Sequence, residues 1–433
     1  MIKEMTQFYA SMVDDTENPP TTKRFYSSCR PMSCEQSHDL YNPIRDLAAA
    51  WDATKILLYY DEKRRKTHHP CDENDDAPPD AFEFSILEDA VKQTLQSYHT
   101  TFCTNLSSSH SYSSNFMQVS SSSAPPPPPL MLTNLPESSN VGHSAMVILA
   151  GNNALRLSLL SVDDIPLDGL LRGILSMQRS DGAFITTFAN QGEGDVETGI
   201  NFYPGEAMVA LMDTHRLSYD MPHIIHPSTR TALIPTMMRA LAFYSRYHSE
   251  ASPDVNYNIW QIQAFSRLHR VLQHDKDSKQ HGTDDCAVVA EYVLTLCQGI
   301  CDSPVWKYEL VRGRSFYPNL QTLEIACGLD ALVDGIAVVV IASTNIKKDK
   351  QRENDAANRN PRDQLHRLQR GVHHAVDFLD WSIDRVPRDA RMGRGGLGHG
   401  GVQVLEQRLD VTGHALSALI KIVDSLSHTK RQQ

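Results

Sequence analysis

From His143 onward the chain is a succession of helical segments with almost no strand pattern between them. Each segment is about 14 to 20 residues long, and short loops rich in Gly, Pro and Asp separate them. Some segments, such as 205–212 and 320–333, are apolar nearly all round, whereas others, such as 231–248 and 364–385, keep one polar face. This alternation predicts an all-α fold in which an outer ring of helices encloses an inner ring.

Two loops favour a closed ring over an open solenoid of two-helix repeats. Residues 176–184, SMQRSDGAF, place Gln-x-x-Asp-Gly-x-Phe at the end of one helix, and residues 394–401, RGGLGHGG, place a glycine-rich turn before the last helix. Asp-Gly supports a tight turn with positive φ, and the following aromatic can insert into the helix layer. With these turns, residues 143–428 resemble the alpha/alpha-toroid enzymes. That group includes six-hairpin glycosidase-like proteins and the terpenoid-cyclase and protein-prenyltransferase fold, so the resemblance implies an architecture rather than one activity.

The first 142 residues have a different composition. Acidic, serine-rich and proline-rich runs at 72–80, 105–116 and 120–130 cannot bury enough apolar surface to offset the entropy of ordering, so we expect linkers or disordered insertions there. Between them, two segments with helical spacing predict a helix pair that forms one outer hairpin of the later domain, split by insertions. We therefore expect an irregular region over 1–142, a helical toroid over 143–428 and a tail over 429–433.

The tripeptide Phe-Tyr-Pro stands ahead of a helical segment twice, at 202–204 and 316–318. Proline is preorganised for the first helical position, so each copy predicts a helix start. In a toroid such starts open on one rim, which would make Tyr203 and Tyr317 substrate-binding residues. Glu206 follows the first copy within one turn, where the helix dipole favours an ionised carboxylate. It is a candidate catalytic base or nucleophile, or an acid that only stabilises its own helix.

The start of the last helix resembles a second rim position. Asp410 is a candidate N-cap and a candidate second catalytic acid, His414 a candidate substrate ligand, and Arg408 a group that binds an anion or pairs with Glu206. Alternatively, these residues only cap the helix and bond to a loop. Trp260 starts another expected inner helix, where it would stack on a substrate or fill the core.

A metal site has one candidate. Asp284-x-Cys286 together with His414 is similar to the zinc ligands of protein prenyltransferase beta subunits, although the interval between Cys286 and His414 is longer than in that family. Zinc needs three converging protein ligands, and Asp284 and Cys286 open a wetter, outer helix. We therefore predict no metal and no cofactor.

Charge and hydropathy narrow the function classes. The 433 residues carry a formal net charge of -11, and the Lys and Arg residues form no run extensive enough for nucleic acid. The longest apolar stretch, 331–343, is too short to span a bilayer, and the N-terminal residues lack an apolar signal core. Eight cysteines without a Cys-x-x-Cys pair suit reduced thiols. These features predict a soluble cytoplasmic protein.

Together, the toroid resemblance and the acids at helix starts favour a carbohydrate-active enzyme that resembles a glycoside hydrolase or an epimerase. Its substrate would be a small molecule or an oligosaccharide, with Glu206 and Asp410 as catalytic carboxylates and Tyr203, Trp260 and Tyr317 as a platform. Two alternatives stay open at this point: an isoprenoid enzyme with an aromatic cavity or a zinc site, and a helical scaffold without catalytic activity.

Overall fold

The structure is a computed structural model. It describes residues 1–14, 25–26, 28–30, 35–37, 43–66, 81–106, 126–133, 135, 139–187, 194–276, 283–303, 306, 322–346, 361–383, 397–398 and 407–432.

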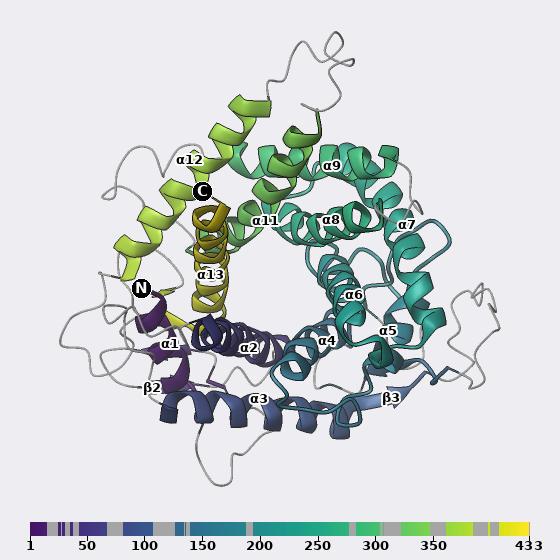
Figure 1. Ribbon diagram of the computed structural model, residues 1–433. Coiled ribbons are helices and arrows are strands. Elements are labelled where there is room, and N and C mark those ends of the chain that lie inside the picture. The colour runs from purple at the N-terminus through teal and green to yellow at the C-terminus, as the bar shows by residue number, and fades with distance from the viewer. Residues whose placement is uncertain are drawn as a thin grey trace.

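A closed ring of six helices forms the centre of this described part (Figure 1). Each of these inner helices packs against the next along the chain, and the last packs against the first. They are α2 (Pro43–Lys66), α4 (Val141–Arg156), α6 (Tyr203–Asp220), α8 (Val255–Lys276), α11 (Thr322–Ile346) and α13 (Leu409–Gln432).

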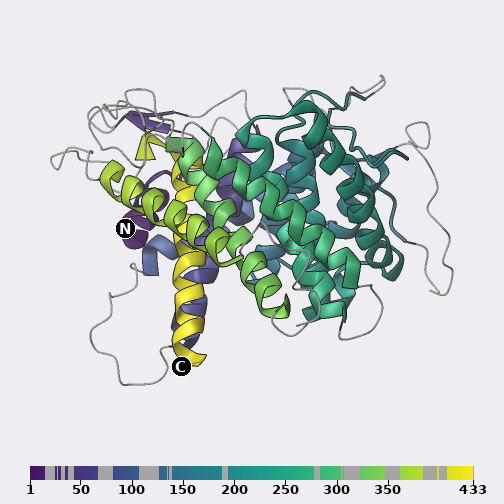
Figure 2. The ribbon, with the colours of Figure 1, turned by 90° about the horizontal axis from the view of Figure 1, so that it is seen from above.

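A second set of helices surrounds this ring, and the chain alternates between the two sets. The outer helices are α1 (Ile2–Ser11), α3 (Ala81–Phe102), α5 (Leu167–Ser176), α7 (Pro227–Ala251), α9 (Thr283–Asp302) and α12 (Pro361–Ile383). Because each outer helix returns the chain before the next inner helix begins, the inner helices share one direction, and their C-terminal ends share one face of the ring. Figure 2 shows α13 running down to this face, with the C terminus at its lower end. The predicted all-α toroid is confirmed.

The region before residue 143 supplies part of the ring. The expected helix pair forms α2 and α3, but the prediction that both are outer helices is wrong. Because α2 packs between α13 and α4, it occupies an inner position, and only α3 lies in the outer set (Figure 1). The acidic run at 72–80, residues 107–116 of the serine-rich run and residues 120–125 of the proline-rich run lie outside the described residues, so the expectation of disorder there stays a prediction.

Burial follows the expected difference between the two rings. In α4, residues 141–155 are all buried, which its many small residues allow on every side. The outer helix α7 buries Leu233, Met237 and Tyr244 and leaves its opposite face wet.

The Asp-Gly turn after α5 forms as predicted. Gly182 has φ of +98°, and the Asp181 carboxylate accepts the Ala183 backbone N–H at 3.1 Å. Phe184 is fully buried in the helix layer. The Gln178 amide donates to the carbonyl oxygens of Gly182 and Thr236, at 3.1 and 2.9 Å. This glutamine therefore fastens the turn to α7.

The described strands are short and antiparallel. One sheet has the order β2-β1-β6-β5 and joins the start of the chain to the approach of α13; its strands are β1 (Ser28–Arg30), β2 (Glu35–Ser37), β5 (Leu397–Gly398) and β6 (Gln407–Arg408). In the other sheet, β3 (Cys103–Asn105) pairs with β4 (Leu130–Leu132). A search of the described residues finds no helix with the length and hydropathy of a membrane span.

Candidate functional site

The helix start predicted at Phe202-Tyr203-Pro204 is confirmed, because α6 begins at Tyr203 with Pro204 in its first turn. The glycine after this proline meets a steric need. A Cβ atom on Gly205 would lie 2.3 Å from the Cβ of Trp260 on α8, so only glycine lets the two inner helices approach this closely. The second copy of the motif, including Tyr317, lies outside the described residues.

Glu206 lies one turn into α6, and its side chain is buried against α4. The residue is 5% exposed, and a Cβ atom on Gly142 would lie 2.2 Å from its Oε2. Oε2 has no hydrogen-bond partner among the described residues. Burial raises the pKa of Glu206 to about 8, although the positive charge of His414 lowers it in part. The carboxyl group is therefore protonated at neutral pH, whereas its place at a helix start suggested an ionised group.

His414, on the first turns of α13, has charged and aromatic neighbours. Its ring lies edge-on to Trp260 with centroids 6.0 Å apart, and its Nδ1 lies 4.0 Å from Oδ2 of Asp330. Burial by itself would lower the pKa of His414, but the neighbouring Cys327, Asp330 and Asp52 outweigh it and raise the pKa well above the usual range. We therefore assign His414 as an imidazolium.

Asp330 is the fully buried counter-ion of this imidazolium. Its Oδ1 lies 2.7 Å from Lys421 Nζ and accepts the Ser417 hydroxyl at 3.0 Å. Burial raises the pKa of Asp330, but Lys421 and His414 outweigh this effect and hold it well below the usual range. An ionised aspartate thus stands beside the histidine.

Two tryptophans stack next to this pair. The rings of Trp51 on α2 and Trp260 on α8 lie 6.2 Å apart with 25° between their planes. Lys55 Nζ lies 3.3 Å from the Trp51 ring centroid and 2.9 Å from the Asp52 carboxylate. Sequence reasoning found Trp260 and missed Trp51. The helical segment that contains Trp51 was visible, but nothing local placed that segment in the inner ring.

Asp410 and Arg408 pair with each other. Arg408 donates from Nε to Asp410 Oδ1 at 3.0 Å and from Nη2 to Oδ2, and Arg45 lies 3.8 Å from Oδ2. Burial raises the pKa of Asp410, but these guanidinium groups outweigh it and keep the carboxylate ionised. Since α13 begins at Leu409, Asp410 lies inside the first turn rather than at the predicted N-cap. The sequence suggested that Arg408 either binds an anion or pairs with Glu206. In the structure Arg408 pairs with Asp410 instead of Glu206.

Tyr203 packs beside Glu206. A Cβ atom on Gly199 or Gly142 would come within 2.3 or 2.9 Å of its ring, so two glycines make room for this half-buried tyrosine. The structure thus gathers Tyr203, Glu206, Trp260 and His414 from three inner helices near their N-terminal ends. Their catalytic and substrate-binding roles stay predictions.

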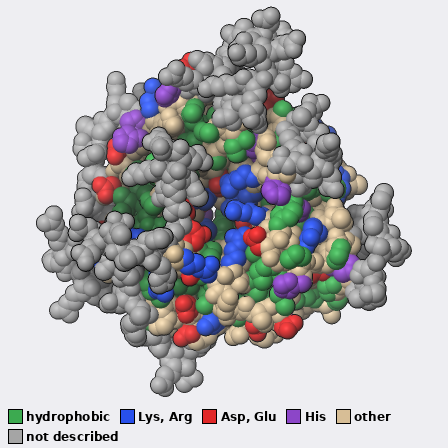
Figure 3. Space-filling model, viewed as in Figure 1, with side chains coloured by type: hydrophobic (Ala, Val, Ile, Leu, Met, Phe, Trp, Pro, Cys, Tyr) green, Lys and Arg blue, Asp and Glu red, His purple; other side chains and the backbone are tan. Residues whose placement is uncertain are grey.

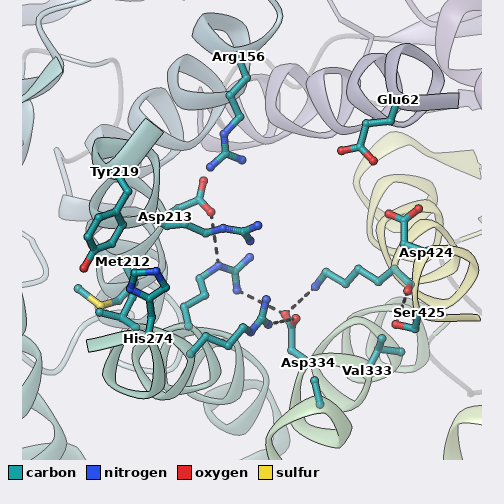
Figure 4. Close-up of a pocket in the computed structure, with 16 residues that line it drawn as sticks. Glu62, Arg156, Met212, Asp213, Tyr219, His274, Val333, Asp334, Asp424 and Ser425 are labelled. Carbon is teal, nitrogen blue, oxygen red and sulfur yellow. Dashed lines mark hydrogen bonds and ion pairs between the residues drawn. The ribbon is translucent and has the colours of Figure 1, made fainter. Parts of the chain in front are cut away.

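A pocket opens on the other face of the ring, among the C-terminal halves of the inner helices and away from Glu206 and His414 (Figure 4). Its volume is about 660 Å³. The space-filling view shows Lys and Arg side chains gathered around this central hollow (Figure 3). The lining comes from all six inner helices and consists of Glu62, Arg156, Met212, Asp213, Arg216, Tyr219, Arg267, Arg270, Val271, His274, Val333, Asp334, Ala337, Lys421, Asp424 and Ser425.

Asp334 anchors the floor of this pocket and is 5% exposed. Its carboxylate oxygens lie 2.6 Å from Arg270 Nη2, 2.7 Å from Lys421 Nζ and 3.4 Å from Arg267 Nη1. Burial raises the pKa of Asp334, and these three cations lower it to about 2. Because Lys421 also contacts Asp330, alternating charges connect the pocket floor to His414.

Metal ligands do not converge in the described part of the chain, where a search finds no group of three or more His, Cys, Asp or Glu side chains able to hold an ion. The candidate zinc ligand Cys286 lies on the outer helix α9 and contacts Gln273 and the His269 carbonyl oxygen. Cys286 therefore lies against the C-terminal half of α8, whereas His414 lies near the N-terminal end of α13.

Comparison with known proteins gives a structural similarity only. Neither a protein-family model nor a curated protein sequence matches the chain. A solved sugar epimerase from a ruminal bacterium is similar over 96% of this chain and 95% of its own, with a TM-score of 0.52 and 12% sequence identity. At this identity the similarity shows a shared helical fold.

Proposed function

We propose that the chain is a carbohydrate-active enzyme that epimerises a reducing sugar at the N-terminal ends of its inner helices. The observation that carries the proposal is a buried glutamic acid whose pKa is raised to about 8, close enough to the His414 imidazolium to feel its charge, beside a stacked tryptophan pair. Titratable groups tuned toward the working pH are typical of acid–base sites. The structural similarity to a solved sugar epimerase also supports an epimerase activity.

The chemistry follows from the two protonation states. A hydrogen on the carbon next to the carbonyl of an open-chain sugar is acidic, so the Glu206 carboxylate takes that proton and leaves an enediolate. The His414 imidazolium, with 14% of its side chain exposed, stabilises the negative oxygen and gives its own proton to the other face of the carbon. Solvent then takes the proton from Glu206 and supplies one to His414, which restores the starting protonation states. One C–H bond breaks and another forms, and the configuration inverts. Trp260 and Tyr203 would pack against the carbon chain of the sugar.

Glycoside hydrolysis is the second candidate, because it also uses a glutamic acid with a raised pKa. It requires a second carboxylate that is free to attack or to activate water. Of the two acids predicted for this role, Asp410 is held by Arg408 and Arg45. This pairing favours epimerisation.

A deuterium-exchange assay tests the proposal. The protein is incubated in D₂O with a panel of reducing mono- and disaccharides, and ¹H NMR follows the carbon next to the carbonyl. We expect an epimer to form with deuterium at that carbon, and Glu206→Gln and His414→Gln each to lower the rate at least about 100-fold. Glu250→Gln, at an exposed position near the end of α7, should leave it unchanged.

The pH dependence separates the two reactions. Epimerisation needs ionised Glu206, so its rate should rise with pH through about 8. Hydrolysis needs protonated Glu206, so its rate should fall over the same range and new reducing ends should appear without deuterium. If the protein binds none of these sugars, both epimerisation and hydrolysis are overturned, and the alternative of a helical scaffold without catalytic activity is favoured.

A further inference from the structure

In the pocket at the C-terminal ends of the inner helices, some of the cationic side chains form ion pairs with an acidic residue and others do not. Arg267, Arg270 and Lys421 share the Asp334 carboxylate. In contrast, the guanidinium groups of Arg156 at the end of α4 and Arg216 near the end of α6 make no hydrogen bond or ion pair within the described residues. The pocket therefore holds two guanidinium groups that form no ion pair with a described residue, although the charge of Asp213 acts on Arg216.

These two arginines act on each other. The pKa of Arg216 is lowered by partial burial and then by the positive charge of Arg156, with smaller effects from Arg270 and Arg267, and Asp213 offsets only part of this. Like charges held around one cavity repel each other unless an anion lies between them. Figure 4 shows Arg156 pointing into the cavity from the wall opposite Asp334.

We propose that this pocket binds a small phosphorylated polyol, such as a sugar phosphate, with the phosphate group on Arg156 and Arg216. Guanidinium groups bind phosphate oxygens in pairs with matched geometry, and two of them suit a dianion. A cavity of about 660 Å³ has the size of typical small-molecule sites.

The other walls suit the polyol part of the ligand. The carboxylates of Glu62 on α2 and Asp424 on α13 lie across the cavity from Asp213 (Figure 4), where they can accept hydrogen bonds from hydroxyl groups. Tyr219 is 43% exposed, and its ring lies 5.2 Å from the His274 ring, which gives a sugar ring an aromatic surface to pack on.

A simpler role for the arginines predicts different results. Cations near helix C-termini offset the partial negative charge of the terminal carbonyl groups and so stabilise the helices. In that case Arg156→Gln and Arg216→Gln should each lower the melting temperature in phosphate-free buffer, with no ligand effect. If the arginines form a phosphate site, removing one relieves repulsion, and each variant should melt at the same or a higher temperature.

Calorimetric titration provides the binding test. Glucose 6-phosphate, inorganic phosphate and glucose are titrated into the full chain at about 0.1 M salt, where surface charges are already partly screened. We expect saturable binding of glucose 6-phosphate, at least tenfold weaker binding of glucose, and at least a tenfold loss of affinity for the phosphate ligand in Arg156→Gln and in Arg216→Gln. Arg246→Gln, on the outer helix α7, serves as the charge-matched control and should bind like the unchanged chain.

The two phosphate ligands identify the source of the group. Tighter binding of glucose 6-phosphate than of inorganic phosphate would support contacts between the other pocket walls and the polyol part of the ligand. Equal affinities that both depend on Arg216 would mean that inorganic phosphate itself is the ligand. If neither binds saturably, or if both arginine variants bind like the Arg246→Gln control, the proposal is wrong. The pocket lies on the face opposite Glu206 and His414, so these outcomes do not depend on whether the chain epimerises a sugar.

Discussion

The carboxyl group of Glu206 shows how burial can outweigh a helix terminus. A first-turn acid gains about 0.3–1 kcal/mol from the helix dipole when it is exposed. Inside the ring, packing against Gly142 and Tyr203 removes the water that would solvate the charge, and this desolvation is the larger effect. The group therefore keeps its proton up to about pH 8.

This proton makes folding stability depend on pH. The native state binds the proton up to about pH 8, whereas the unfolded chain releases it near 4.5, so the free energy of unfolding decreases as pH rises between these values. Over the whole window the loss is roughly 3 to 5 kcal/mol. Glu206→Gln cannot lose a proton, so urea unfolding at pH 5 and pH 8 should show a smaller decrease for this variant than for the unchanged chain.

Glu250→Gln is the matched control for this measurement, because that glutamate is exposed. It should keep the full decrease between pH 5 and pH 8. An equal decrease in the unchanged chain and in Glu206→Gln would contradict the raised pKa.

The sequence identified Glu206 but not its protonation state. The proline before it marks a helix start, which is a local signal. Gly142, against which its carboxyl group packs, belongs to another helix, and the proximity of the two residues depends on how α4 and α6 pack in the ring. For the same reason the ion pair between Asp410 and Arg45 had no signal in the sequence near residue 410.

The contact between α6 and α8 depends on one glycine. Gly205→Ala would place a methyl group 2.3 Å from the Cβ of Trp260 and within 3.3 Å of its backbone, so the two helices must separate. We expect a loss of about 1 to 3 kcal/mol in the free energy of unfolding, as for other overpacked sites. Chemical denaturation of the variant measures this loss.

Gly371→Ala on α12 is the control for that substitution. Its added methyl group would meet its nearest atom, Cys301 Sγ, at 3.5 Å, which is an ordinary contact. Alanine in a helix interior should then add about 0.5 to 1 kcal/mol of stability. A Gly205→Ala variant as stable as Gly371→Ala would refute the close approach of α6 and α8.

Helix spacing was enough to predict the helices from residue 143 onward, because each element carries its own apolar pattern. The prediction that they close into a ring depended on the two loops and on the resemblance to toroid enzymes. The place of α2 was harder to predict. Its apolar face fits an outer or an inner helix equally well until α13 and α4 are known to lie on either side of it. The pocket was missed for a related reason, since its lining extends from Glu62 to Ser425 and no short motif contains more than a few of its residues.

Three helices of the inner ring, α8, α11 and α13, share one set of buried charges. Lys421 on α13 contacts both Asp330 and Asp334 of α11, one turn apart, at 2.7 Å each. Lys421→Met would leave two buried carboxylates short of a cation, and we expect it to destabilise the fold by about 3 to 5 kcal/mol. Calorimetric melting of Lys421→Met, of Asp334→Asn and of the double variant tests whether the two side chains are coupled. The free energy of unfolding of the double variant should fall by less than the sum of the two single losses. Additive losses would show that the two side chains act independently.

Closure of α13 onto α2 has a consequence for biosynthesis. The ring cannot be completed until the last inner helix has left the ribosome, so the side of α2 that α13 covers stays uncovered while the intervening helices are made. We expect a chain that ends before β5 to bind a hydrophobic dye and to recruit chaperones, whereas the full chain should not. Dye fluorescence of the two purified chains measures the difference, and equal signals would mean that α2 is protected in some other way during synthesis.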